Sequence, residues 1–200
     1  MKTKLKNIAN IQLGYSFRSK IQKDFNGNMS IIQMKDLTED FRVNINHLDK
    51  IELHDSKAHH EVKKNDIIFK SRGSDTTACF MESTISDVIL AAPLLRIRIK
   101  SKNIIPEYIF WYLNQKTAQA FLKKRTKGTS QKMINKQSLE ELEIEIPDLK
   151  KQQQIVEIAQ LAEKEQKLLE NLRNKKYKLI STILLNQVKE NNNGNKSSKR

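Results

Sequence analysis

The chain has 200 residues, of which 37 are lysine or arginine and 23 are aspartate or glutamate, so its formal net charge is +14. This balance favours a polyanionic partner, with nucleic acid ahead of an acidic membrane surface. The chain contains no apolar run near the ~20 residues of a membrane span and no apolar core typical of a signal peptide. The single cysteine, Cys79, excludes an intramolecular disulfide. Composition therefore predicts a cytoplasmic protein that binds nucleic acid.

Short apolar segments separated by turn residues predict a globular α+β (mixed α/β) domain over residues 1–149. A short helix or helix–strand junction is expected to end at Gly14, and the apolar residues after Pro106 predict a helix that runs to about Arg125. Strands are expected at residues 29–34, 51–53, 67–69, 79–81, 94–99 and 142–146. A segment of this length is ample for one hydrophobic core.

Residues 150–189 contain no glycine or proline and are predicted to form one long helix. At about 1.5 Å per residue this helix extends roughly 60 Å, and its apolar stripe stays in water unless a second helix covers it. We therefore expect a partner helix, most simply from a second copy of the chain. Residues 190–200 are predicted to be a disordered polar tail. Within the predicted helix, the positions that alternate three and four residues apart form the seam typical of a coiled coil, and most of them are apolar. They are Ile155, Ile158, Ala162, Glu165, Leu169, Leu172, Lys176, Leu179, Ile183 and Asn186.

No established catalytic motif occurs in the chain: it lacks a Walker P-loop, a glycine-rich dinucleotide loop, a nucleophile elbow and a methyltransferase signature. His54, His59 and His60 lack the spacing of a zinc site. Asp55, followed by Glu61 and Lys63, matches the order of acid and lysine residues in metal-dependent nucleases. Short matches of this kind are frequent in chains rich in lysine and glutamate, so solvated loop side chains are the simpler interpretation. We expect no catalytic residue, no metal site and no cofactor.

One basic segment, residues 123–136, contains six cations and no acidic residue. At its centre, residues 128–131 (GTSQ) offer backbone donors and hydroxyls that suit phosphate contacts, and Gln131 has the length to reach a base edge. The alternative is a solvated helix end whose cations complement the helix dipole. The six cations are Lys123, Lys124, Arg125, Lys127, Lys132 and Lys136.

A second basic segment, residues 70–74 (KSRGS), combines cations, hydroxyls and a glycine that lets the backbone approach a phosphate. An ordinary strand-ending turn explains it equally well. Arg18 and Lys20 are a third, weaker candidate. The residues predicted to contact DNA are Lys70, Arg72, Ser74, Lys127, Thr129, Ser130 and Gln131.

Taken in order, these segments resemble the DNA-specificity subunits of type I restriction-modification systems over nearly the full length. The resemblance rests on residues 5–14 (LKNIANIQLG), residues 63–74 (KKNDIIFKSRGS) and the helix at 107–122. It continues through the 128–131 loop, Ile146 and Pro147, and closes with QQQI at 152–155 and LISTILL at 179–185.

The resemblance implies that residues 1–149 form a target recognition domain. Members of this family usually carry two such domains and two helical segments, whereas this chain has one of each. It is therefore expected to act as a half-subunit that pairs as a homodimer, with antiparallel helices, on a bipartite, palindromic site in double-stranded DNA. The helix is also expected to dock methyltransferase (M) subunits, with restriction (R) subunits in the same complex. The implied interface residues are Ile155, Ile158, Ala162, Leu169, Leu172, Leu179 and Ile183.

The resemblance also implies a subunit that is not itself catalytic, because S-adenosylmethionine, ATP and Mg²⁺ belong to partner subunits. Two alternatives stay open. One is a dimeric DNA-binding regulator without a methyltransferase partner, and the other is a metal-dependent nuclease that uses Asp55, Glu61 and Lys63.

Overall fold

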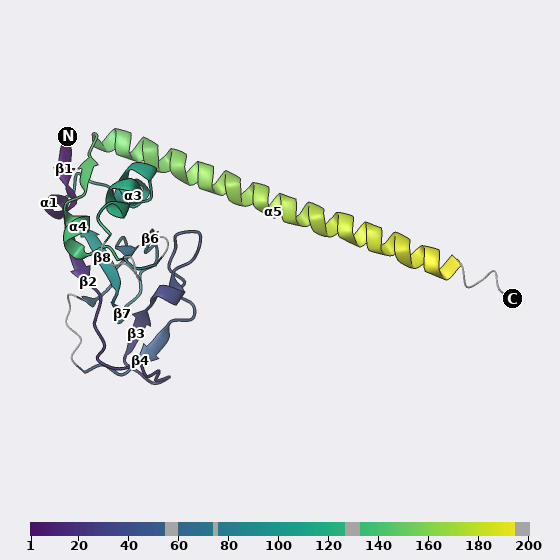
Figure 1. Ribbon diagram of the computed structural model, residues 1–200, viewed down its shortest axis with the longest axis horizontal. Coiled ribbons are helices and arrows are strands. Elements are labelled where there is room, and N and C mark those ends of the chain that lie inside the picture. The colour runs from purple at the N-terminus through teal and green to yellow at the C-terminus, as the bar shows by residue number, and fades with distance from the viewer. Residues whose placement is uncertain (55–59, 74–75, 127–132, 195–200) are drawn as a thin grey trace. The chain divides into compact units, whose positions relative to one another are not determined.

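The computed structural model describes residues 1–54, 60–73, 76–126 and 133–194, and the side chains of that part up to residue 188 (Figure 1). The chain divides into two units, Met1–Val156 and Glu157–Arg200. The first is an α+β domain and the second is built on one long helix, so the predicted fold class is confirmed. In chain order the elements are β1 (Lys2–Lys4), α1 (Leu5–Ile8), β2 (Ala9–Leu13), β3 (Met29–Ile32), the 3₁₀ helix η1 (Met34–Asp36), β4 (Asp49–Ile51), β5 (Ile67–Lys70), β6 (Ala78–Phe80), β7 (Val88–Leu90), β8 (Leu94–Ile99), α2 (Pro106–Leu113), α3 (Lys116–Lys123), α4 (Lys136–Glu140), β9 (Glu143–Glu145) and α5 (Leu149–Gly194).

The centre of the domain is a four-stranded antiparallel sheet in the order β2-β8-β5-β6. Because side chains alternate along a strand, Ile67 and Phe69 of β5 face one side of this sheet and Ile68 faces the other. All three are fully buried. The side of Ile67 and Phe69 is covered by α1 to α4 and by the pair β1–β9. Because both sides of β5 are covered, on the second side by the sheet described next, its residues 67–69 form an uninterrupted apolar run.

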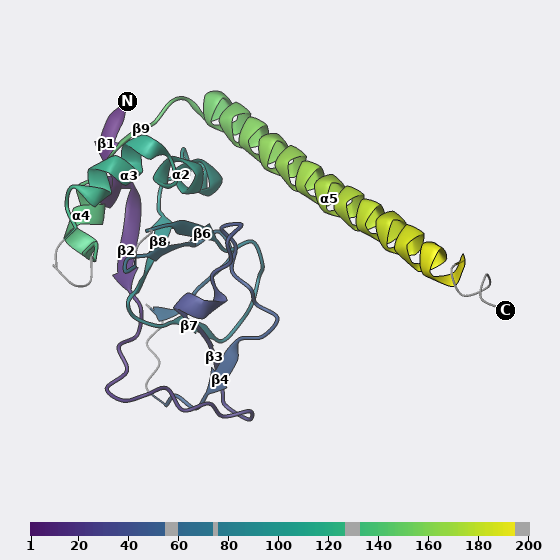
Figure 2. The same cartoon turned by 45° about the vertical axis from the view of Figure 1, so that its right-hand side comes forward.

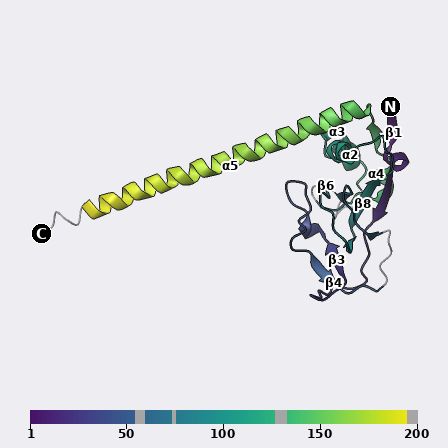
Figure 3. The same ribbon diagram turned by 180° about the vertical axis from the view of Figure 1, so that it is seen from behind.

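A three-stranded sheet in the order β4-β3-β7 covers the other side of the four-stranded sheet, and its β3 and β7 are parallel. Ile32 and Leu90 pack with Ile68 between the two sheets, whereas Ile31 and Ile89 belong to a separate outer cluster. Figure 2 and Figure 3 show β3 and β4 on the opposite side of β8 from α2 and α3. The domain therefore has three layers.

The helix predicted from Pro106 to Arg125 is interrupted, which corrects the sequence-based prediction. It forms two helices, α2 and α3, because the backbone is extended at Gln115 (φ −75°, ψ 150°). The preceding residue, Asn114, turns its side chain to the edge strand β6. Its Nδ2 donates to the carbonyl of Ala78 and its Oδ1 accepts from the N–H of Ala78, both at 3.0 Å. These two bonds fasten α2 to the sheet at the point where α3 begins.

Gly14 directly follows β2, and no side chain fits at its position. A Cβ atom at this position would lie 2.6 Å from the carbonyl carbon of Ala91. The Gly14 N–H donates to Leu94 O at 2.9 Å, and the next N–H, that of Tyr15, donates to Leu90 O at 2.6 Å. The close approach ties the start of the chain to β7 and β8.

Gln152 anchors the beginning of α5 to the domain and is fully buried. Its Oε1 accepts from the N–H of Ile105 at 2.9 Å, and its Nε2 donates to the carbonyls of Asn103 and Pro147 at 3.1 and 2.9 Å. All the hydrogen-bonding capacity of this amide except one lone pair is used, as a buried polar side chain requires. This requirement explains the first glutamine of the QQQI segment.

Beyond Val156, α5 carries an exposed apolar stripe. Of the predicted interface residues, Ile155 is half-buried and packs on the core of its own domain, whereas the other six are exposed. The helix continues to Gly194, past residue 189 where the sequence predicts its end. No helix in the described ranges is long and apolar enough to cross a membrane.

Candidate nucleic-acid interface

Lys70 and Arg72 are the predicted DNA-contacting residues that the structure describes. Both lie where β5 ends: Lys70 is half-exposed, Arg72 is exposed, and Gly73 follows with a left-handed φ of 121°. Ser74, Lys127, Thr129, Ser130 and Gln131 lie outside the described residues, as do Asp55 and His59.

Ser71, which also counted among the hydroxyls of the predicted phosphate contact, is used inside the fold. Its side chain is buried, and its Oγ donates to the carbonyl of Pro93 at 2.5 Å. A hydroxyl engaged in this way fixes the turn instead of facing a ligand. The turn therefore presents its cations, chiefly Arg72, to solvent.

The two basic segments predicted separately from the sequence are neighbours in the fold. The N–H of Ile134 donates to the carbonyl of Ser71 at 2.8 Å, and Arg72 forms a β-bridge with Met133. The described end of the 123–136 segment therefore lies against the 70–73 turn. This contact joins residues about sixty positions apart into one surface.

Arg72 also lines a surface groove with residues from the loop after β2 and from the β3–β4 region. The groove contains four cations and one carboxylate, a net charge of +3, and its apolar lining includes Phe17, Ile21 and Pro93. A concave surface of this sign concentrates polyanions. Its charged and polar side chains are Ser16, Ser19, Lys20, Lys23, Gln33, Lys35, Asp49 and Arg72.

Asp49 organises one wall of this groove. Its Oδ2 accepts from Lys35 Nζ at 2.6 Å and from Gln33 Nε2 at 2.9 Å, and its Oδ1 lies 2.9 Å from Lys23 Nζ. The hydrogen bond from Lys35, followed by that from Lys23, lowers the pKa of Asp49 to about 2. The carboxylate is therefore ionised at neutral pH and holds two lysines and one amide in fixed positions.

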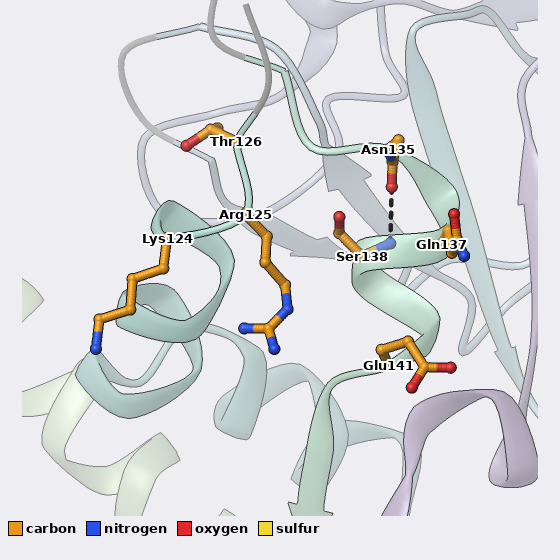
Figure 4. Close-up of a pocket in the computed structure, with 7 residues that line it drawn as sticks. All are labelled: Lys124, Arg125, Thr126, Asn135, Gln137, Ser138 and Glu141. Atoms are coloured by element: carbon orange, nitrogen blue, oxygen red, sulfur yellow. Dashed lines mark hydrogen bonds between the residues drawn. The ribbon is translucent and has the colours of Figure 1, made fainter.

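A second polar pocket lies between the end of α3 and α4 (Figure 4). In Figure 4 the Arg125 side chain points into the space between these helices, and Lys124 points away from it. The Arg125 guanidinium lies 3.6 Å from the centroid of the Phe121 ring, a cation–π contact that orients it. On the facing helix, Asn135 Oδ1 accepts from the Ser138 N–H at 2.7 Å. The pocket therefore contains one oriented cation, Arg125, at the end of the described range 76–126.

Of the residues proposed for a nuclease, the structure describes Glu61 and Lys63. Lys63 Nζ lies 3.9 Å from Glu61 Oε2, a loose surface pair, and Asp55 is outside the described residues. Within the described ranges no three histidine, cysteine, aspartate or glutamate side chains are grouped to hold a metal ion. Cys79 is buried, and its burial raises the pKa of the thiol to about 11. The thiol is therefore protonated at neutral pH.

Sequence reasoning missed Lys23, Gln33, Lys35 and Asp49. These residues are scattered over 27 positions and share no motif. They meet because β3 pairs with β4, with Ile31 opposite Asp49, which places the β3–η1 junction beside Asp49. Of the four groove cations, the sequence singled out Arg72 and, more weakly, Lys20, and both line the groove.

The fold and the groove define an α+β domain that has a cationic surface and continues into a long amphipathic helix. A family model described as "Type I restriction modification DNA specificity domain" matches residues 1–178. The chain belongs to this family, which confirms the resemblance read from the sequence.

The chain is also similar to individual known proteins, one in sequence and two in structure. The specificity subunit of the type I restriction enzyme MjaVIII from Methanocaldococcus jannaschii is 32% identical over 97 residues, covering 48% of this chain and 22% of that protein. A chain from a study of complex assembly and conformational transition in the type I R-M system has a TM-score of 0.63 at 17% identity, covering 88% of this chain and 41% of that one. The HsdS subunit from Thermoanaerobacter tengcongensis has a TM-score of 0.56 at 15% identity, covering 82% and 37%. The chain therefore spans less than half the length of each of these relatives.

Proposed function

We propose that this chain is a sequence-specific DNA-binding subunit of a type I restriction-modification complex that recognises one half of a bipartite target. The observation that carries the proposal is the groove of Lys20, Lys23, Lys35 and Arg72, whose Arg72 is bridged to Met133, in a chain of the DNA specificity family. In this function the chain is not a catalyst. Methyl transfer and ATP-driven cleavage, with S-adenosylmethionine, ATP and Mg²⁺, belong to its M and R partners.

The charge of the groove suits the phosphate backbone. Lys20 and Arg72 are exposed, and no ion pair to either is found among the described residues. Such cations are free to replace the counterions of a duplex, which is the main source of sequence-independent affinity. Phosphate contacts fix the register and orientation of a protein on the duplex, and contacts to base edges read the sequence. The groove therefore supplies the orientation that sequence reading requires.

We further propose that two copies pair through α5. Ile158, Leu172 and Leu179 are each more than half exposed in the single chain. An amphipathic helix this long is stable in water only when a second helix covers its stripe. Two copies would supply the two recognition domains that larger family members carry in one chain. Ile155 contributes less to such a pair because it already packs on its own domain.

The test combines two measurements on the full chain. Sedimentation equilibrium, alone and with the M subunit, should show a dimer that takes up the M subunit. Selection from a pool of random duplexes should yield a bipartite palindrome. A monomer that ignores the M subunit and enriches no sequence would overturn the proposal. A dimer that enriches a palindrome but ignores the M subunit would instead support the dimeric regulator.

A further inference from the structure

Gln33 is an uncharged side chain with both donor and acceptor atoms in a groove otherwise dominated by cations. It follows the last residue of β3, caps η1 and is half-buried. Its backbone N–H donates to Asp36 Oδ2 at 2.8 Å, and its backbone carbonyl accepts from the Asp36 N–H at 3.0 Å. Rigid elements on both sides therefore fix the position of this residue.

The amide of Gln33 is also oriented. Nε2 donates one hydrogen to Asp49 Oδ2 at 2.9 Å, and a carboxylate can only accept, so this contact determines which end of the amide is nitrogen. A glutamine amide has two N–H donors and an oxygen with two lone pairs. After the contact to Asp49 one N–H donor and the amide oxygen remain. One donor beside one acceptor is what a glutamine uses to pair with the N7 and N6 atoms of adenine.

The charges around Gln33 favour a base over a phosphate. Lys23 and Lys35 are both paired with Asp49, and Asp36 accepts from the Gln33 N–H, so the two cations and two carboxylates around Gln33 carry no net charge. Lys20 and Arg72 supply the unpaired charge elsewhere in the groove. Ser16 and Ser19 also line it, but a hydroxyl forms no bidentate pair that distinguishes one base.

We propose that Gln33 reads an adenine in each half of the target and that Asp49 is the positioning residue that orients its amide. The inference rests on the proposed DNA-binding function and goes beyond it by naming the reading residue and its base. It also assigns Asp49 a role in specificity that is separate from any role in affinity.

The test begins with the duplex that the full-length wild-type chain selects from a random pool. Gln33→Ala should weaken binding to this duplex by roughly tenfold or more and leave binding to a scrambled duplex unchanged. Repeating the selection with the variant should show a relaxed preference at one adenine per half-site. Gln12→Ala is the matched control, because Gln12 is also half-buried but donates only to the neighbouring carbonyl of Leu13 and is not part of the groove.

Asp49→Ala separates positioning from a merely structural role. It should relax the preference at the same adenine while strengthening binding to the scrambled duplex, because the charge of the groove rises from +3 to +4. A variant that is only less stable would weaken both duplexes alike. Should Gln33→Ala fail to fold, Gln33→Met keeps the length of the side chain without its amide.

The outcomes distinguish the two proposals. If the wild-type chain shows no base preference, the proposed function fails. If the wild type selects a sequence and the Gln33 variants select the same sequence with equal strength, only the inference about Gln33 is overturned.

Discussion

Replacing Leu169 and Leu172 by lysine is the sharpest test of the exposed stripe on α5. These two leucines are 59% and 63% exposed in the single chain. Full burial of a leucine is worth about 1.5–3 kcal/mol, so covering the remaining six-tenths is worth about 1–2 kcal/mol each. A dimer covers four of them, or about 4–7 kcal/mol, which corresponds to a loss of roughly 10³- to 10⁵-fold in dimer affinity.

Sedimentation equilibrium over a range of concentrations measures this loss directly. The double variant should sediment as a monomer at concentrations where the wild-type chain is a dimer, while denaturant unfolding of the domain stays unchanged. Leu185→Lys with Val188→Lys is the matched control, because these residues are 61% and 59% exposed but lie on the opposite face of the helix. A control that also dissociates would show a general charge effect, and a Leu169/Leu172 variant that stays dimeric would refute the pairing.

Three further predictions each concern one side chain. Arg72→Ala should weaken binding to all duplexes alike and reduce the slope of log affinity against log salt by about 0.9, as expected for one lost phosphate contact; an unchanged slope would place Arg72 outside the interface. Gln152→Leu should lower the free energy of unfolding by about 2–4 kcal/mol in a urea titration, because three backbone groups lose their partner, whereas the exposed Gln154→Leu should have little effect. The pKa of Asp49 is about 2, below its ordinary value of 3.8. The stability it contributes is therefore present above about pH 4 and lost as the pH falls towards 2, and Asp49→Asn should remove that part of the acid dependence.

The fold was largely predictable because its strongest signals are local. An uninterrupted apolar run predicts β5, clean alternation predicts β8, and a heptad pattern predicts α5. The break at Gln115 was not predictable, since the apolar spacing continues through it. It depends on Asn114 bonding to the backbone of Ala78, a tertiary contact that no periodicity encodes.

The candidate site was predictable only in part, because charge composition is local information and charge arrangement is not. The turn with Arg72 was visible as a basic cluster. The Asp49 network was not, since it joins Lys23, Gln33 and Lys35 through strand pairing. Asp66, in the 63–74 segment that carries the family resemblance, is a second residue whose role could not be predicted from the sequence. Its buried carboxylate forms a two-bond ion pair with Arg98, at 2.7 and 2.6 Å, which has a structural role.

The groove and the α5 stripe belong to different units of the chain, and this separation makes the two halves of the proposed function independent in experiments. A monomer made by the Leu169 and Leu172 changes keeps every residue of the groove, so its intrinsic affinity for one half-site should be unaltered. What it loses is the effective concentration that a dimer gives to its second domain once the first is bound, a gain of roughly 10²–10⁴. Affinity for a single half-site therefore reports on the groove. The ratio of full-site to half-site affinity reports on the helix, and a defect in one does not imitate a defect in the other.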